Sequence, residues 1–539
     1  MHEKGHSALT FSTKSFYLIL GLSFIISFLG LFIPVMEVDA SQYASMSLEL
    51  LQSNSFLQLT DLGENYLDKP PLLFWLSAIS IKLLGNTSFA FKLPSFLLAW
   101  FSVYALYRWV QLYYEESIAR YAAIAYTCSV GFLIFTNDIR TDTLLISFVV
   151  LSLWQASQWL KNKRIKHLVF ASIFAGFALL AKGPIGLMVP ILAILPHLIL
   201  KKELRGIFQL QVLLIPVVLL FVLTPMLIGL YQQWGMHGIQ FFFWEQSFGR
   251  ITGENVWEND ASYFYFLHNI IWVVLPFTLF FIYGFIHTIR NWKDQNEYIS
   301  FFGLVLPFIA LSLSHYKLPH YIYVLLPFCA LLIAKGIHHW LNQQNKKGDS
   351  AIYFGQSLLI AAILILPILI FIAFPGNMLS YVIYILGGLA FILSFYLMGW
   401  NKKIFVLNSI GAYLLVAFII NSHGYPHLLN YQGSSAIAFY LKKNNPENLP
   451  VYQHNIWWRA FHYYSGGKIP EFNFSAIDQE AVLVVTDEKG LEKFDSYPNK
   501  SIESFDHFNI TRLSLDFLNP KTRKQKLNSL YLITIKKTP

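Results

Sequence analysis

Acidic and basic side chains that could act on a phosphate-linked substrate gather between the first two long apolar segments of the chain. This stretch opens with Glu37 and Asp39 and closes with Tyr66, Asp68 and Lys69, followed by two prolines. A carboxylate can take a proton from a hydroxyl group, and a lysine can bind a phosphate. Apolar segments flank the stretch, so we expect these groups at one membrane face, where a substrate that is part lipid and part anion could meet them. A polar loop between two spans, without chemistry of its own, would explain the same residues.

The composition is that of a membrane protein. Of the 539 residues, 55% are hydrophobic and only 13% are charged, whereas soluble domains carry about a quarter charged residues. The net charge of +9 comes from short basic clusters between apolar runs, which indicates orientation in a membrane and no nucleic-acid partner. Cys128 and Cys329 both lie inside apolar runs, so they predict neither a disulfide framework nor a Cys-rich metal site.

Apolar runs of membrane-spanning length predict a polytopic α-helical protein with about thirteen transmembrane helices. The run 72–84 is short and contains Lys82, so we expect it to lie along the membrane surface. The first span is expected to stay uncleaved, because it is longer than a signal peptide needs and many spans follow. The predicted spans are 16–36, 90–110, 119–136, 142–160, 167–181, 184–200, 209–231, 263–286, 298–314, 320–337, 352–374, 379–398 and 403–421.

The basic clusters decide the predicted orientation. If 72–84 does not cross the membrane, all of these clusters fall on one side, which the positive-inside rule makes the cytoplasm. The external loops 37–89 and 232–262 and the C-terminus then lie on the opposite side. Residues 1–425 are therefore expected to form the transmembrane domain. The clusters are at 161–166, 201–202, 290–293, 346–347 and 402–403.

Residues 426–539 differ in composition and are expected to form a small extracytoplasmic α/β domain. Residues 434–443 are typical of an amphipathic helix, and a second helix is expected at 488–494. Three strands are expected, at 451–452, 481–485 and 531–535. The segment has no glycine-rich phosphate loop, so acceptor docking or a structural lid is the expected role.

Further polar motifs fall at the ends of predicted spans on the external side. Asp138, Arg140 and Asp142 open the fourth span, and Lys182 with Gly-Pro follows the fifth. The loop 232–262 contains a run of aromatic residues with Glu245 and Arg250, and Lys317-Leu-Pro-His320-Tyr321 opens the tenth span. A proline separates His315 from His320, which argues against a metal site made by that pair.

Taken in order, these motifs resemble the polyprenyl-phosphate-sugar-dependent GT-C glycosyltransferases. Within that class the chain is most similar to the bacterial lipid A aminoarabinose transferases and the protein O-mannosyltransferase-like proteins, over residues 16–340. The resemblance implies a multi-pass protein of the bacterial inner membrane with an extracytoplasmic active site. It also implies a polyprenyl-phosphate-linked sugar as donor and a glycolipid or a protein as acceptor.

The resemblance implies a role for each matched residue. Asp39 would act at the acceptor, and Asp142 would be the second catalytic acid, with Asp138 as its alternative. Asp68 and Glu245 stand where relatives use a glutamate and a histidine to bind a metal; a divalent metal is possible here, but the missing histidine leaves no certain cofactor. Donor-phosphate contacts are expected from Tyr66, Lys69, Arg250 and Tyr321, and secondary candidates are Glu37, Asp138, Arg140, Lys182, Lys317 and His320.

The residue types support this chemistry independently. A sugar on a polyprenyl phosphate leaves behind a monophosphate, whose charge Lys69 and Arg250 could stabilise. Asp39 could take the proton of the acceptor, and direct displacement would invert the anomeric carbon. Two other classes stay open: a transporter, although its charges would be expected at mid-membrane, and a scaffold or sensor with an external binding domain.

Overall fold

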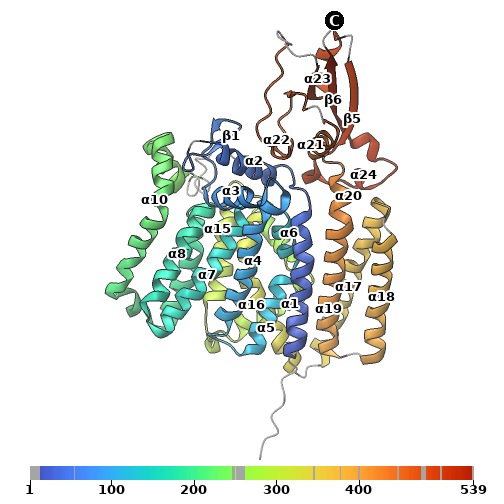
Figure 1. Ribbon diagram of the computed structural model, residues 1–539. Coiled ribbons are helices and arrows are strands. Elements are labelled where there is room, and N and C mark those ends of the chain that lie inside the picture. Colours follow the sequence, from blue (N-terminus) through green and yellow to red (C-terminus); the bar gives the residue numbers. More distant parts are fainter. Residues whose placement is uncertain are drawn as a thin grey trace, which may run out of the picture.

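The computed structural model describes residues 12–53, 55–245, 249, 261–343, 346–376, 378–398, 401–445, 448–474, 481–497 and 500–536. Long helices stand side by side in a bundle, and a small domain that contains the C-terminal strands rises from one end of it (Figure 1). The long helix α1 begins at the opposite end of the bundle. The protein therefore has an apolar helical body and a polar cap on one side.

The described residues contain eight helical segments that are long and apolar enough to cross a membrane. Two bent helix pairs would raise that number to ten: α5 (Glu116–Thr127) with α6 (Val130–Asn137), and α13 (Tyr265–Val273) with α14 (Thr278–Arg290). The eight are α1 with η1 (Thr13–Phe32), α4 (Ser88–Val110), α7 (Thr141–Asn162), α8 (Ile165–Lys182), η3 with α10 (Leu210–Trp234), η6 with α16 (Pro319–Asn342), the Gly348–Ala373 part of α17 (Lys346–Ala373), and α19 (Lys402–Ile419) with η7 (Ile420–Gly424) and α20 (Tyr425–Leu429).

Each of these ten segments coincides with a predicted span. The other three predicted spans fall on shorter apolar stretches: α9 (Ile185–Leu200), α15 (Ile299–Leu313) and the Met378–Ser394 part of α18 (Met378–Met398). The polytopic helical class is confirmed, and the number thirteen stays a prediction. Shorter helical segments connect the spans: η2 (Leu204–Phe208), α11 (Met236–Gln240), η4 (Phe241–Glu245) and η5 (Trp292–Asp294).

The first external stretch, expected as a loop, is largely helical. It contains α2 (Asp39–Gln52), then the short paired strands β1 (Thr60–Asp61) and β2 (Glu64–Asn65), then α3 (Leu72–Leu84). Helices α2 and α3 pack together at the end of the bundle that carries the small domain (Figure 1). Leu83 and Leu84 at the end of α3 are exposed, which suits a helix that rests in the membrane interface.

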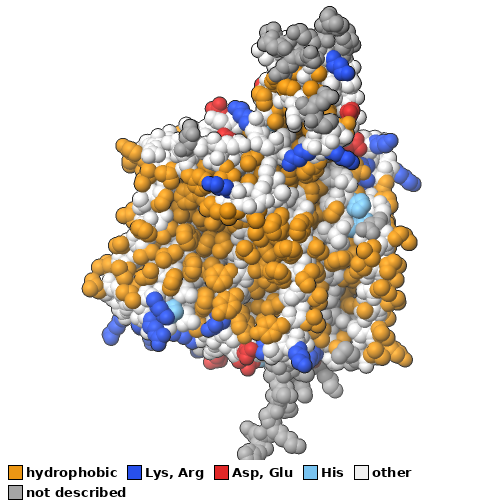
Figure 2. Space-filling view, viewed as in Figure 1, with side chains coloured by type: hydrophobic (Ala, Val, Ile, Leu, Met, Phe, Trp, Pro, Cys, Tyr) orange, Lys and Arg blue, Asp and Glu red, His pale blue; other side chains and the backbone are white. Residues whose placement is uncertain are grey.

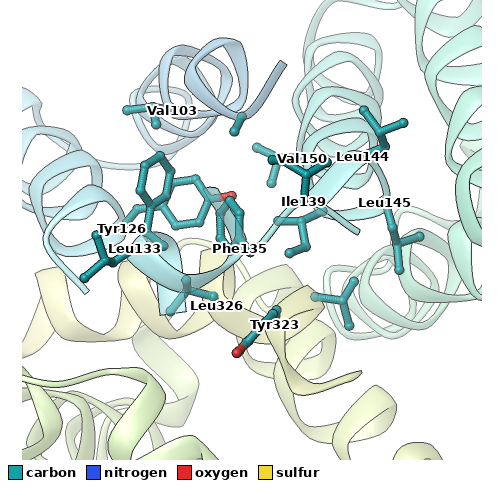
Figure 3. Packing of buried hydrophobic residues seen from close by; sticks show 14 of the residues in the cluster. Val103, Tyr126, Leu133, Phe135, Ile139, Leu144, Leu145, Val150, Tyr323 and Leu326 are labelled. Atoms are coloured by element: carbon teal, nitrogen blue, oxygen red, sulfur yellow. The ribbon is translucent and has the colours of Figure 1, made fainter. Parts of the chain in front are cut away.

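Buried apolar side chains fix the starts of the helices that carry the polar motifs. Phe135, Ile139, Val150 and Leu326 converge where α6, α7 and the η6–α16 segment meet (Figure 3). All four are almost completely buried, so α7 and η6 cannot shift independently without opening a cavity in a close-packed core. Ile139 directly precedes Arg140, and its burial therefore fixes the chain where the polar site begins.

Basic side chains line the edge of the bundle opposite the small domain, at the bottom of Figure 2. Several of them bond main-chain oxygens of other connections: Lys161 to Leu112, Lys201 to Gln295 at 2.5 Å, and Lys402 to Trp340 at 2.8 Å. These contacts bring connections far apart in sequence to one end of the bundle, as the positive clusters predict.

The C-terminal region forms a four-stranded sheet in the order β3-β4-β6-β5. Strand β3 runs parallel to β4, and β6 runs antiparallel to both β4 and β5. The expected helices and strands are present; β5 and α22 were not predicted. The elements are α21 (Gly433–Asn444), β3 (Val451–His454), α22 (Arg459–Ser465), β4 (Ala481–Asp487), α23 (Glu488–Leu491), η8 (Glu492–Phe494), β5 (Lys500–His507), η9 (Ile510–Arg512), α24 (Leu515–Leu518), η10 (Arg523–Lys526) and β6 (Asn528–Lys536).

Candidate active site

A cavity of about 150 Å³ lies where the start of α3 meets α7, α8, α9, α15 and η6. One end of it is polar and the other is apolar, so it suits a ligand with a charged head and a hydrocarbon tail. The polar end is lined by Asp68, Lys69, Asp142, Lys182, Ser314 and Tyr321, and the apolar end by Leu145, Ile185, Met188, Val189, Leu192, Pro307, Ala310 and Leu311.

Lys69 reaches this cavity from the segment that leads into α3. Its Nζ lies 2.5 Å from Oδ2 of the neighbouring Asp68. The two prolines after Lys69 restrict the backbone just before the helix begins. The lysine ammonium is therefore held at the polar end of the cavity beside a carboxylate.

Asp142 and Lys182 form an ion pair between two adjacent spans. Asp142 lies in the first turn of α7 and Lys182 is the last residue of α8, and each charge complements the dipole of its own helix. Gly183 ends α8 with a φ of +85°, a conformation that glycine adopts without strain. Lys182 Nζ also lies 4.2 Å from the centroid of the Tyr321 ring, so two cavity-lining residues fix the position of this cation.

Arg140 joins the acidic residue after the first span to the start of α7. Its guanidinium pairs with Asp39 through Nη1 and, at 2.8 Å, with Asp138 through Nε. His320 lies against the same group, with Nδ1 3.3 Å from Arg140 Nη1 and Nε2 3.8 Å from Asp142 Oδ2. Pro319 begins η6 at a position where proline is favoured, which places His320 and Tyr321 in the first turn. The structure thus unites residues from α2, α7, α8 and η6.

Tyr66 lies beside Asp68 at the entrance to α3. Burial first, and then the charge of Asp68, raise the pKa of Tyr66 well above its usual value. Its phenol therefore stays protonated at neutral pH and keeps a hydrogen that an anion could accept.

Two of the secondary candidates point away from the cavity. Glu37 is 3% exposed, and its carboxylate accepts hydrogen bonds from Ser434 Oγ at 3.0 Å and from the main-chain nitrogen of Ala460 at 2.8 Å. Lys317 donates to the carbonyl of Ala261 at 3.1 Å. Burial lowers the pKa of Lys317. Glu37 is held by the C-terminal domain, and Lys317 holds the end of the loop 232–262.

The expected metal site is not assembled by the described residues. Glu245 ends η4, and Arg250 lies outside the described residues. Within the described ranges no group of three or more His, Cys, Asp and Glu side chains is placed to hold a metal ion, and this includes His315 and His320. The Lys69 ammonium already pairs with the Asp68 carboxylate, so a metal ion would have to compete with it for that group. We therefore derive no step through a metal.

Sequence reasoning missed two parts of the site. The pairing of Asp142 with Lys182 joins residues 40 positions apart, and no local pattern signals it. The apolar end of the cavity is built by α9 and α15. Their sequences resemble those of other spans, and even their internal prolines recur in α4, α10 and α17.

The chain is similar to the GT-C glycosyltransferases, the class that its motifs resemble. The profile of the dolichyl-phosphate-mannose-protein mannosyltransferase family matches residues 68–228. The resemblance recognised from the sequence is thereby confirmed at the level of the class.

The chain is also similar in sequence to individual enzymes. Undecaprenyl phosphate-alpha-4-amino-4-deoxy-L-arabinose arabinosyl transferase of Pseudomonas savastanoi pv. phaseolicola is 25% identical over 322 residues, 59% of each chain. The enzyme of the same name from Serratia proteamaculans is 25% identical over 316 residues, 55% of this chain and 54% of its own. The chain thus matches between half and two thirds of the length of these relatives.

The fold is similar to that of a solved structure. The crystal structure of ArnT from Cupriavidus metallidurans bound to undecaprenyl phosphate superposes with a TM-score of 0.75 at 15% identity, covering 97% of this chain and 98% of that chain. Its apo structure gives a TM-score of 0.73 at 14% identity, with the same coverage. The likeness therefore extends through the C-terminal domain.

Proposed function

We propose that this protein is an integral membrane glycosyltransferase that moves a sugar from a polyprenyl-phosphate donor to a lipid or protein acceptor. The reaction takes place at the extracytoplasmic face of the bacterial inner membrane, with inversion at the anomeric carbon. The observation that carries the proposal is the cavity with Lys69, Lys182 and Tyr321 at its polar end and α9 and α15 at its apolar end.

The donor would lie along this cavity. Its isoprenoid chain packs against apolar residues of α9 and α15, such as Val189 and Leu311. Its phosphate lies between Lys69 and Lys182, where ammonium groups bind the oxygens as point charges. Tyr66 lies three residues before Lys69 but is not among the residues that line the cavity, and its contact with the phosphate stays a prediction.

The cations stabilise the bond-breaking step. As the anomeric C–O bond breaks, its electron pair leaves with the phosphate, which gains negative charge that Lys69 and Lys182 already face. Asp142 keeps Lys182 in place through their ion pair. We assign Asp142 this positioning role, because only 3% of its side chain is exposed.

Asp39 is the proposed general base. It takes the proton of the acceptor hydroxyl while the oxygen attacks the anomeric carbon from the side opposite the phosphate. It lies at the start of α2, at the end of the bundle that holds the cavity, and 36% of its side chain is exposed. An acceptor from the aqueous side can therefore reach it.

Replacement of Lys69 tests the phosphate-binding role. We expect Lys69→Ala to lower turnover about 10²–10³-fold, as loss of one preorganised charge partner does in other enzymes. The measurement is sugar transfer by the purified protein against donor concentration. Lys82→Ala is the matched control, because Lys82 lies in the last turn of α3, the helix that follows Lys69, and is exposed and outside the cavity. Equal activity of Lys69→Ala and Lys82→Ala would refute the phosphate role.

A further inference from the structure

The C-terminal region holds the segment of six residues, 33–38, between the first span and α2 through bonds to Val35 and Glu37. The main-chain nitrogen of Val35 donates to the hydroxyl of Tyr464 at 2.7 Å. The side-chain amide of Gln432 bridges the same segment: its oxygen accepts from the nitrogen of Glu37, and its nitrogen donates to the carbonyl of Val35, both at 2.9 Å. Gln432 is completely buried, so these bonds form away from water.

The carboxylate of Glu37 joins three helices. It accepts from Ser434 of α21, from the main chain of Ala460 in α22, and from Ser41 in the first turn of α2. Because the group is buried, Ser434 and the main chain of Ala460 would lose this acceptor if the carboxylate were removed, whereas Ser41 also reaches the carbonyl of Val38.

A second connection joins the C-terminal region to α2 by way of Asp61. Arg459, the first residue of α22, forms a two-point ion pair with Asp61 of β1, with nitrogen–oxygen distances of 2.9 and 3.0 Å. Asp61 also accepts a hydrogen bond from the side-chain amide of Gln42 at 2.8 Å. Gln42 lies in α2 one turn after Asp39. The C-terminal domain is thus linked to the chain before Asp39 through Glu37, and to α2 after Asp39 through Asp61 and Gln42.

We propose that the C-terminal domain is a positioning element of the active site, which fixes α2 and with it Asp39 through Glu37 and Asp61. The inference rests on the proposed function and adds a role for the domain beyond acceptor docking. The donor-binding residues Lys69, Lys182 and Tyr321 lie on other elements: before α3, at the end of α8 and in η6. Loosening the connection should therefore disturb the base and leave donor binding unchanged.

Two substitutions of Glu37 distinguish a positioning role, which needs its hydrogen bonds, from a catalytic role, which would need its negative charge. In Glu37→Gln the amide oxygen can still accept from Ser434 and Ala460, while the new NH₂ group donates to Ser41, whose hydroxyl already reaches the carbonyl of Val38 at 2.9 Å. Glu37→Ala removes all of these bonds. We expect Glu37→Gln to keep kcat within about threefold and Glu37→Ala to lower it about 10–100-fold, with the donor KM changed less than about twofold.

Substitutions on the domain side give a second, matched comparison. Gln432→Ala removes two main-chain hydrogen bonds to the segment before α2. Asn445→Ala also removes two, but both are to Leu449 within the domain. We expect a lower kcat and faster hydrogen exchange of the α2 amides, measured by mass spectrometry, in Gln432→Ala only.

The outcomes separate this inference from the proposed function. Positioning is overturned if Glu37→Gln is as inactive as Glu37→Ala, if the donor KM rises instead of kcat falling, or if Gln432→Ala matches Asn445→Ala in α2 exchange. An unmodified protein that transfers no sugar would refute the proposed function, while the exchange measurement would still decide whether the domain fixes α2.

Discussion

Two carboxylates share Arg140, and this sharing distinguishes their roles. Asp138 pairs with Nε at 2.8 Å and has 16% of its side chain exposed, whereas Asp39 pairs with Nη1 and has 36% exposed. If Asp39 turns toward an acceptor, Arg140 remains neutralised by Asp138, so the movement leaves no isolated buried charge. Of the two, Asp39 is therefore the carboxylate that can exchange its arginine partner for an acceptor hydroxyl.

The titration of Glu37 predicts how the stability of the protein depends on pH. Burial raises the pKa of Glu37 above its usual 4.5, against the lowering effect of the bonds from Ser41, Ala460 and Ser434. The folded protein then binds this proton more tightly than the unfolded chain does. The contribution to stability is therefore complete below pH 4.5 and is lost as pH rises through the raised pKa.

Thermal unfolding in detergent, followed from pH 4.5 upward, checks this prediction. The Tm of the unmodified protein should fall more steeply than that of Glu37→Gln, which cannot titrate. Parallel curves for the two proteins would contradict the assigned burial of the carboxyl group.

Most of the chemistry-bearing residues could be predicted from the sequence because charges are rare in this chain. Lys69, Asp142 and Tyr321 stand at the ends of apolar runs, and all three line the cavity. Their partners could not be predicted, since ion pairs such as Asp142 with Lys182 depend on how distant spans pack. The partners of Glu37 could not be predicted either, because Ser434, which donates to its carboxylate, lies almost 400 residues later in the chain.

At the scale of elements, the paired helices α9 and α15 decide what the cavity can hold. Neither helix brings a charged side chain to it, and their facing residues are apolar. Two packed helices with an apolar gap open at one end can accept an isoprenoid chain without any polar group losing hydration. Because this gap lies beside Lys182, the proposed lipid site would adjoin the proposed phosphate site.

Filling the gap should weaken donor binding. Ala310 lines the cavity from α15, and a tryptophan there would occupy part of the space for the isoprenoid chain. We expect Ala310→Trp to raise the donor KM about tenfold or more, since overpacking costs typically 1–3 kcal/mol. The measurement is turnover against donor concentration.

Ile309 offers the control for this substitution. It is the preceding residue on α15, 47% exposed and outside the cavity lining. We expect Ile309→Trp to leave the donor KM unchanged. If both tryptophans raise KM equally, the effect comes from the helix as a whole and the gap is not the donor site.

Element boundaries show where sequence reasoning succeeds and where it fails. Hydropathy alone locates spans such as α4 and α10, because an apolar run of that length has few other uses. It does not find α2, because Asp39–Gln52 has only 14 residues and interrupts its apolar residues with serines and charged groups. That helix is stabilised by packing on α3 and α22, and tertiary contacts of this kind have no local signature.

At the scale of the whole molecule, the polar site and the C-terminal domain share one end of the bundle, and the basic connections occupy the other (Figures 1 and 2). This distribution of charge, with the positive-inside rule, supports the proposal that the site is extracytoplasmic. This assignment follows from charge distribution and is open to a direct test.

Cysteine labelling in cells tests the orientation. The two native cysteines are buried, so single new cysteines should dominate the reaction with membrane-impermeant reagents. We expect Ser501→Cys, exposed on β5, to react once any outer membrane is made permeable, and Lys163→Cys, exposed in a basic connection, to resist. The reverse pattern would place the site in the cytoplasm and would mean that a span, most directly α3, was assigned wrongly.

The central claim is that Asp39 is the general base of a transfer that uses a polyprenyl-phosphate donor. Asp39→Asn keeps the size of the side chain and a hydrogen-bonding oxygen for Arg140, but the amide cannot take a proton at neutral pH. The most direct measurement is the turnover of purified Asp39→Asn beside Glu37→Gln, with donor binding followed separately. The account predicts that Asp39→Asn binds donor normally and loses about 10²–10⁴-fold in turnover, while Glu37→Gln stays active. An Asp39→Asn protein that keeps most of its turnover would contradict it.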